Sequence, residues 1–210
     1  MLKRYSIIIS LIVILLFSLS LLAQTTKDNA KNEVNSDATK QVNQSYLSSV
    51  KELEMTGNYT VNIEQSNTPK LSIVGKNKKD LNVYIEGNRL FIESKKGKSK
   101  IKWMKDSEIE VNLSLRQINE ISVNGVVSMQ NVNPIKGENL KIELNGVGSI
   151  ELSKLEYDKI SSTVNGTGSV ELNGKTNVLV LYLNGVGSID TQNLKAYKCR
   201  AENEGIGSIS

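Results

Sequence analysis

The chain has 210 residues, 39% of them hydrophobic, which suffices for one domain with a sizeable core and argues against disorder throughout. Aromatic residues make up only 5%, so the core must consist mainly of Ile, Leu and Val, which favour strands. The lack of histidine excludes His-dependent triads and His-ligated metals, a single cysteine excludes an intramolecular disulfide, and a formal net charge of +4 does not favour nucleic acid as a partner.

The N-terminus has the pattern of an export signal. Basic residues precede an apolar run from about Ile7 to Ala23, as in the basic and apolar regions of a signal peptide. We expect residues 1–23 to be removed, with an uncleaved membrane anchor as the alternative. Gln24 stands where a bacterial lipoprotein signal needs cysteine. The protein is therefore expected outside the cytoplasm, in the periplasm, on the outer membrane surface or secreted, and in contact with a membrane only through an uncleaved segment.

Residues 24–45 are mostly polar, and their few small apolar groups cannot offset the entropy of ordering them, so we predict a flexible spacer. The folded domain is expected over 46–210. Its first part, 46–117, contains irregularly spaced runs of alternating apolar and polar residues, which predict strands. These runs are Tyr59–Ile63, Leu71–Val74, Leu81–Ile85, Leu90–Ile92 and Ile109–Leu113.

Two features stand out in this first part. The segment Glu86-Gly-Asn-Arg89 predicts a hairpin turn. A lysine-rich run beside Trp103 predicts either a patch that binds polyanions or a solvated loop. The lysines are Lys95, Lys96, Lys98, Lys100 and Lys102.

The second part, 118–210, repeats an Asn-Gly-x-Gly-Ser-Ile/Val unit about every 20 residues. The first glycines of the five units step by 21, 20, 19 and 20 residues, a regularity typical of a solenoid whose coils return the chain to one lateral position. The units begin at Asn124-Gly125, Asn145-Gly146, Asn165-Gly166, Asn184-Gly185 and Glu204-Gly205.

Apolar residues keep the same register. The position two residues before the first four glycines and the position four residues after all five are apolar, which predicts inward columns running through stacked coils. The four asparagines would form a hydrogen-bonded ladder at a corner that the glycines allow to be tight. Cys199 falls in a register otherwise held by Leu140, Ile160 and Leu179, and is expected to be a small core residue.

Two architectures accommodate these repeats. Asn-Gly is also a strong hairpin signal, so an antiparallel meander is the alternative to parallel coils. Identical residues at a 20-residue period favour parallel stacking, since hairpins would alternate the roles of successive turns. We therefore predict an all-β, right-handed parallel β-helix, with the irregular part 46–117 as its N-terminal cap.

Signs of chemistry are sparse. The Gly-x-Gly-Ser units lack the third glycine or the Gly-Lys-Ser/Thr of nucleotide-binding loops, and serine replaces the aspartate of calcium-binding solenoid turns. No cofactor or metal is expected. Glu151 and Glu171 share a register and would lie on neighbouring coils, where they could act on a glycan or remain solvated surface carboxylates.

These features together resemble a known family. The signal-like N-terminus, the irregular strands around Leu81-Asn-Val-Tyr-Ile-Glu-Gly-Asn-Arg-Leu-Phe-Ile92 and the Gly-Val-Gly-Ser-Ile coils are similar to the "putative auto-transporter adhesin, head GIN domain" family of exported bacterial proteins. The resemblance implies a parallel β-helix with an adhesin-like role at the surface, and it brings no established catalytic residues.

We therefore expect a non-enzymatic envelope or cell-surface protein that binds a glycan or a surface protein. The alternatives are a carbohydrate-active β-helix enzyme and a structural module that self-associates. The last rests on Gly207-Ser-Ile-Ser210, which stops inside a repeat unit, so that the C-terminal edge is expected to be open and able to pair with another chain.

Overall fold

The computed structural model describes residues 32–33, 44–95 and 109–210. The chain divides into two units, Met1–Asn32 and Glu33–Ser210, and only the second is described here. The expected signal peptide and nearly all of the expected spacer lie outside the described residues. Almost all of the described part is strand. Its elements are β1 (Asn32–Glu33), α2 (Gln44–Leu47), β2 (Glu52–Thr56), β3 (Asn58–Gln65), β4 (Lys70–Val74), a 3-10 turn (Lys78–Asp80), β5 (Leu81–Glu86), β6 (Arg89–Ser94), β7 (Glu110–Leu115), β8 (Glu120–Val123), β9 (Val126–Asn131), β10 (Ile135–Leu144), β11 (Val147–Val164), β12 (Thr167–Leu183), β13 (Val186–Asp190), β14 (Leu194–Asn203) and β15 (Ile206–Ile209).

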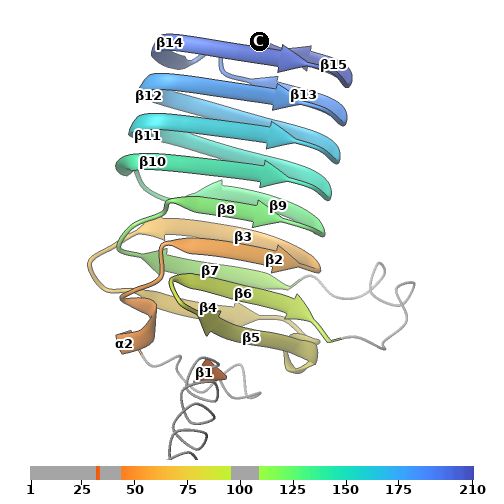
Figure 1. Ribbon diagram of the computed structural model, residues 1–210. Helices are drawn as coiled ribbons and strands as arrows, with labels where there is room; N and C mark the ends of the chain where they lie inside the picture. Colours follow the sequence, from red (N-terminus) through yellow and green to blue (C-terminus); the bar gives the residue numbers. More distant parts are fainter. Residues whose placement is uncertain (1–31, 34–43, 96–108) are drawn as a thin grey trace, which may run out of the picture. The chain divides into compact units, whose positions relative to one another are not determined.

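Successive coils stack in parallel, as Figure 1 shows from β8 and β9 to β14 and β15. What we call the first sheet contains the strands that lead into the glycine corners, together with β6, which pairs with β2. These strands are β2, β8, β10, the later parts of β11 and β12, and β14. The second sheet contains the strands that leave the corners, together with β7, which pairs with β3. These strands are β3, β9, the early parts of β11 and β12, β13 and β15. The parallel solenoid is thus confirmed over the meander, while its right-handedness stays a prediction.

A short third side joins the second sheet of one coil to the first sheet of the next. There Ile135–Gly137 pairs with Leu155–Tyr157, which pairs with Gly174–Thr176. The register slips between Leu152 and Leu155, because Ser153 and Lys154 of β11 stand opposite the single residue Asn173 of β12. Lys154 has a φ of +55°, a left-handed conformation that fits this corner.

The N-terminal part differs from the repeats in its strand order. β2 lies between β6 and β8, and β3 lies between β7 and β9, so coils that are distant in sequence stack directly. At the end of the stack, β4 is antiparallel to β7 and β5 is antiparallel to β6 (Figure 1). The predicted hairpin is confirmed, since Glu86 pairs with Arg89 across the turn. The region is therefore partly a cap, as expected, and partly two further coils, which its lack of Asn-Gly units concealed.

Inward columns of Ile, Leu and Val form the core along the stack. Val123, Leu144, Val164 and Leu183, which precede the corner, are each 1% exposed or less. Such burial contributes about 2 kcal/mol per side chain, which is why the alternation of the sequence decides the register. The prediction for Cys199 is wrong. Its backbone pairs with that of buried Leu179, but Cys199 is exposed, because β14 pairs only with β12 among the described strands and no coil covers its other side.

The corner glycines allow neighbouring coils to touch backbone to backbone. A Cβ atom on Gly146 would lie 1.8 Å from the carbonyl oxygen of Gly125, and one on Gly125 would lie 2.0 Å from that of Gly57. Gly57 is therefore the first member of this column, which sequence comparison missed because Thr56 stands in place of asparagine. The second glycine of the later units adds a conformational requirement to the same close contact. A Cβ atom on Gly148 would lie 1.8 Å from the carbonyl oxygen of Val127, and Gly148 adopts a φ of +142°, which side-chain-bearing residues rarely adopt.

Candidate binding surfaces

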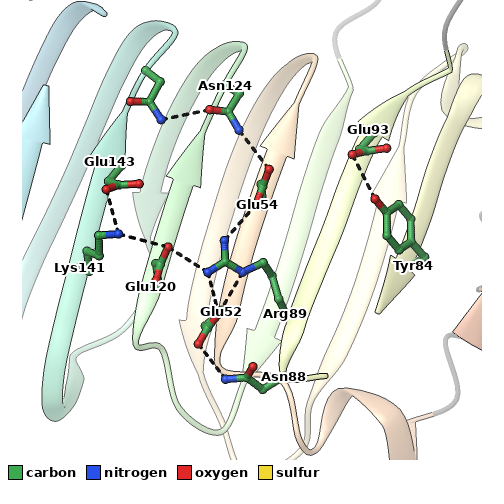
Figure 2. Close-up of polar contacts among 11 residues, drawn as sticks. Glu52, Glu54, Tyr84, Asn88, Arg89, Glu93, Glu120, Asn124, Lys141 and Glu143 are labelled. Atoms are coloured by element: carbon green, nitrogen blue, oxygen red, sulfur yellow. Dashed lines mark hydrogen bonds and ion pairs between the residues drawn. The ribbon is translucent and has the colours of Figure 1, made fainter. Parts of the chain in front are cut away.

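The asparagine ladder runs along the corner between the two sheets. The amide nitrogen of Asn145 donates to Asn124 at 3.1 Å, Asn165 to Asn145 at 2.8 Å, and Asn184 to Asn165 at 2.9 Å. Asn124 in turn donates to Glu54 at 3.2 Å (Figure 2). Each amide is thus used by the next coil, and the ladder ends on a carboxylate. This arrangement serves stacking and leaves little for a ligand to replace.

The outer side of the first sheet carries a network of ion pairs centred on Arg89 (Figure 2). Its guanidinium contacts Glu52 at 2.8 Å, Glu54 at 3.0 Å and Glu120 at 3.0 Å. Lys141 extends the network, at 3.7 Å from Glu120 and 2.8 Å from Glu143. The pairs join β6, β2, β8 and β10, the strands whose spatial order departs from their sequence order.

The network shifts the pKa values of both its basic and its acidic side chains. Burial lowers the pKa of Arg89, but the hydrogen bonds that Arg89 donates to Glu52 and Glu54 outweigh burial and raise that pKa above its ordinary value. Burial opposes ionisation of Glu52 as well, yet hydrogen bonds from Asn88 and Arg89 and the charges of Arg89 and Lys141 hold the pKa of its carboxyl below the ordinary value. The hydrogen bond to Glu143 raises the pKa of Lys141.

The outer side of the second sheet is organised as three columns in register. The first, next to the corner, is exposed and apolar except for Thr167, which lies between Val147 and Val186. Val126, Val147 and Val186 are 46–51% exposed and Ile206 is 74% exposed. A column of serines follows, in which Ser169 donates to Ser149 at 3.3 Å. The third column places Gln130, Glu151, Glu171 and Asp190 on successive coils.

Glu151 and Glu171 are therefore on neighbouring coils, as their spacing predicted. The hydrogen bonds that they accept come from uncharged groups, from Ser149 at 3.2 Å and Asn173 at 2.9 Å. Asp190 accepts from the backbone of Gln192 at 3.0 Å. No ion pair within the described ranges includes these three carboxylates, so the second sheet presents uncompensated negative charge beside exposed apolar side chains.

A groove of about 460 Å³ crosses the third side and is open to solvent. Lys136, Glu156 and Lys175 form one of its walls, in register on three coils. Asp158 and Asn177 form the other wall, and the amide of Asn177 donates to Asp158 at 3.1 Å. Between the two walls runs a middle column, formed by Gly137, Tyr157 and Thr176, which is the floor of the groove.

That floor is low because its side chains point away from solvent or are absent. Gly137 has no side chain, and a Cβ atom there would lie 2.8 Å from the ring of Tyr157. Tyr157 is 3% exposed, its hydroxyl donates to the carbonyl of Ile118 at 2.7 Å, and burial raises its pKa. Thr176 donates to the backbone of Asp158 at 3.2 Å.

The lysine-rich patch falls mostly outside the described residues. Of its five members only Lys95 is described, and its ammonium donates to the carbonyl of Lys79 at 3.0 Å. The patch Lys95, Lys96, Lys98, Lys100 and Lys102 therefore stays a prediction. Over the described ranges, no cluster of three or more His, Cys, Asp or Glu residues could hold a metal ion. In the same part of the chain, no helix is long and apolar enough to cross a membrane.

Sequence reasoning missed the groove and the Arg89 network for different reasons. One wall of the groove could have been predicted from the sequence, because Lys136, Glu156 and Lys175 all stand ten residues before a corner glycine. The network was not, because Arg89 meets Glu52 and Glu120 only through the unusual strand order of the N-terminal part.

The stacked coils define a β-solenoid that carries its charged side chains on its outer surfaces. The chain belongs to the family "Putative auto-transporter adhesin, head GIN domain", whose model matches residues 50–210. Membership implies a surface or exported protein.

Two solved structures are similar to this chain. A "putative adhesin" from Bacteroides fragilis has a TM-score of 0.71 and 27% identity, over 76% of this chain and 74% of that chain. A "putative lipid binding protein" from Parabacteroides distasonis has a TM-score of 0.54 and 18% identity, over 82% of this chain and 77% of that chain, and shows the fold alone. A comparison with curated proteins finds no match.

Proposed function

We propose that this protein is a non-enzymatic, adhesin-like protein of the bacterial envelope or cell surface, which binds a glycan or protein target through an outer face of its solenoid. The observation that carries the proposal is the exposed column Val126, Val147, Thr167, Val186 and Ile206, which is apolar except for Thr167. Exposed apolar side chains contribute little to folding, and a group of them on the surface of a domain marks an interaction site. The export-like pattern before Gln24 and the "putative adhesin" description of the Bacteroides fragilis structure support the same reading.

Hydrolysis of a glycan is less well supported. Glu151 and Glu171 stand on neighbouring coils of an open sheet, and neither lines the groove. A general acid needs surroundings that keep its proton near neutral pH, usually an apolar pocket. Both carboxylates instead face solvent or uncharged hydrogen-bond donors. Their arrangement suits a charged display surface better than a catalytic pair.

The test measures adhesion and turnover together. The full-length protein is purified and applied to surfaces coated with neutral polysaccharides, sulfated polysaccharides or extracellular matrix proteins, and release of sugar reducing ends is followed in parallel. We expect saturable binding to at least one surface and no sugar release. Adhesion to none of them, or release that is abolished by Glu151→Gln or Glu171→Gln, would overturn the proposal.

A matched pair of variants tests the apolar column itself. Val186→Asp adds charge within the column, and Val132→Asp adds the same charge at a valine that is 64% exposed but lies outside the second sheet. A protein target that uses this face would lose binding to the first variant and keep binding to the second. Cell fractionation with surface protease treatment then tests the expected location.

A further inference from the structure

We infer that the groove on the third side binds a neutral, hydroxyl-rich glycan chain lying along the solenoid axis. The inference rests on the proposed function and names one of its target classes. Three observations carry it: the shape of the groove, its balanced charge and the arrangement of its donors and acceptors.

The shape suits an extended ligand. The groove crosses three stacked coils, and neighbouring strands lie about 4.8 Å apart, so its length is about 10 Å, or roughly two sugar rings. Gly137 keeps the floor low, and Tyr157 and Thr176 on the same column are turned inward and buried. A volume of about 460 Å³ lies within the range of small-molecule sites.

The charge of the groove argues for a neutral ligand. Lys136 and Lys175 supply two positive charges, and Glu156 and Asp158 supply two negative charges. Lys175 pairs with Glu156 at 2.9 Å. A polyanion would meet repulsion from both carboxylates, and a polycation would meet it from both lysines. Neither sign of ligand charge is favoured.

Donors and acceptors are interleaved along both walls. Ammonium groups alternate with a carboxylate on one wall, and a carboxylate stands beside an amide on the other. Sugar hydroxyls both donate and accept, so they can pair with such alternating groups, which an apolar or singly charged ligand cannot. The hydroxyl of Tyr157 is already committed to Ile118, and its ring is buried, so binding relies on hydrogen bonds rather than on stacking. A single groove should therefore bind weakly, and adhesion would need many copies.

The test uses the full-length protein with dextran, mannan and a β-1,3-glucan as neutral probes and heparin as a polyanionic probe. We expect at least one neutral polysaccharide to bind, with little change between low and high salt, because no net charge is neutralised. Lys175→Met and Asp158→Asn should each weaken that binding by about tenfold, the effect of losing a hydrogen bond to a charged group.

Two control variants have matched chemistry outside the groove. Lys159→Met lies on the same strand as Asp158, and Glu86→Gln lies on β5, and both residues are exposed. Neutral glycan binding should be unchanged in both. Because the groove residues are exposed, their variants should also keep the wild-type melting temperature.

The possible outcomes distinguish the inference about the groove from the proposed function. Equal loss in groove and control variants, or binding of heparin alone with strong salt dependence, overturns the inference. If no polysaccharide binds but the protein still adheres to matrix proteins, the groove inference fails while the proposed function stands. If nothing binds, both fail.

Discussion

The outer sides of the two sheets use charge in opposite ways. On the first sheet Arg89 and Lys141 lie among four carboxylates, and four ion pairs cross between strands. Asn88 and Asn124 add hydrogen bonds to Glu52 and Glu54. On the second sheet Glu151, Glu171 and Asp190 stack in register with only uncharged donors. Like charges opposite each other destabilise a sheet, so the second arrangement costs stability.

This difference separates a structural surface from a displayed one. The first sheet needs lateral contacts because β2 enters between β6 and β8 without the repeat that aligns later coils. The second sheet follows the corner, where the glycines and the asparagine ladder already determine the register. Its outward residues are therefore free to differ from what stability alone would select.

The largest expected effect lies at the corner that both sheets share. Gly166→Ala should destabilise the protein by about 3 kcal/mol or more, because the new methyl group would lie 1.8 Å from the carbonyl oxygen of Gly146 and must separate two coils. Gly87→Ala is the control. Its methyl group would meet nothing within 4 Å, and only the φ of +63° disfavours it, at about 1 kcal/mol. Urea unfolding of both variants measures the difference, and equal losses would contradict the close-contact explanation.

The next effect tests the structural role of the first sheet. Arg89→Met should cost about 2 kcal/mol, because it leaves Glu52, Glu54 and Glu120 close together with no guanidinium between them. Arg200→Met is the matched control, since Arg200 also pairs with a glutamate, Glu202, but is fully exposed. No measurable change is expected there. A similar unfolding midpoint for both variants would show that the network does not hold the N-terminal coils.

A pH series refines the same test. The pKa of Glu52 is lower in the folded protein than its ordinary value of 4.5. Its ionised form therefore contributes stability that is fully present above 4.5 and is lost as pH falls through the folded-state pKa. The difference in unfolding free energy between the wild type and Glu52→Gln should shrink from about pH 7 to about pH 3. A difference that is constant with pH would contradict the assigned contacts.

The sequence predicted the architecture of the repeat region, 118–210, but not the strand order of the irregular region, 46–117. Asn124 to Ser210 carry the corner glycines and apolar columns at fixed spacing, and one alignment therefore predicts the inward columns on both sides of the corner. It fails for Cys199, which is exposed although it is in register with buried Leu179. The coil containing Gly57 has the same corner, but Thr56 replaces the asparagine of the repeat motif, so the sequence pattern does not reveal it. Side-chain partners such as Arg89 and Glu120 depend on strand order, which neither local pattern nor spacing encodes in 46–117.

The smallest effect compares the two sheets directly. Glu171→Gln should raise stability by up to about 0.5 kcal/mol, because it relieves repulsion from Glu151 and Asp190 and an amide oxygen can still accept from Asn173. Glu143→Gln, on the first sheet, should lower stability by a similar amount, because it removes the ion pair with Lys141. Both changes should fade at high salt, where exposed charges are screened. Shifts of the thermal unfolding midpoint in opposite directions would show that the second sheet retains carboxylates that folding does not need. Equal signs would mean that the two surfaces do not differ in this respect.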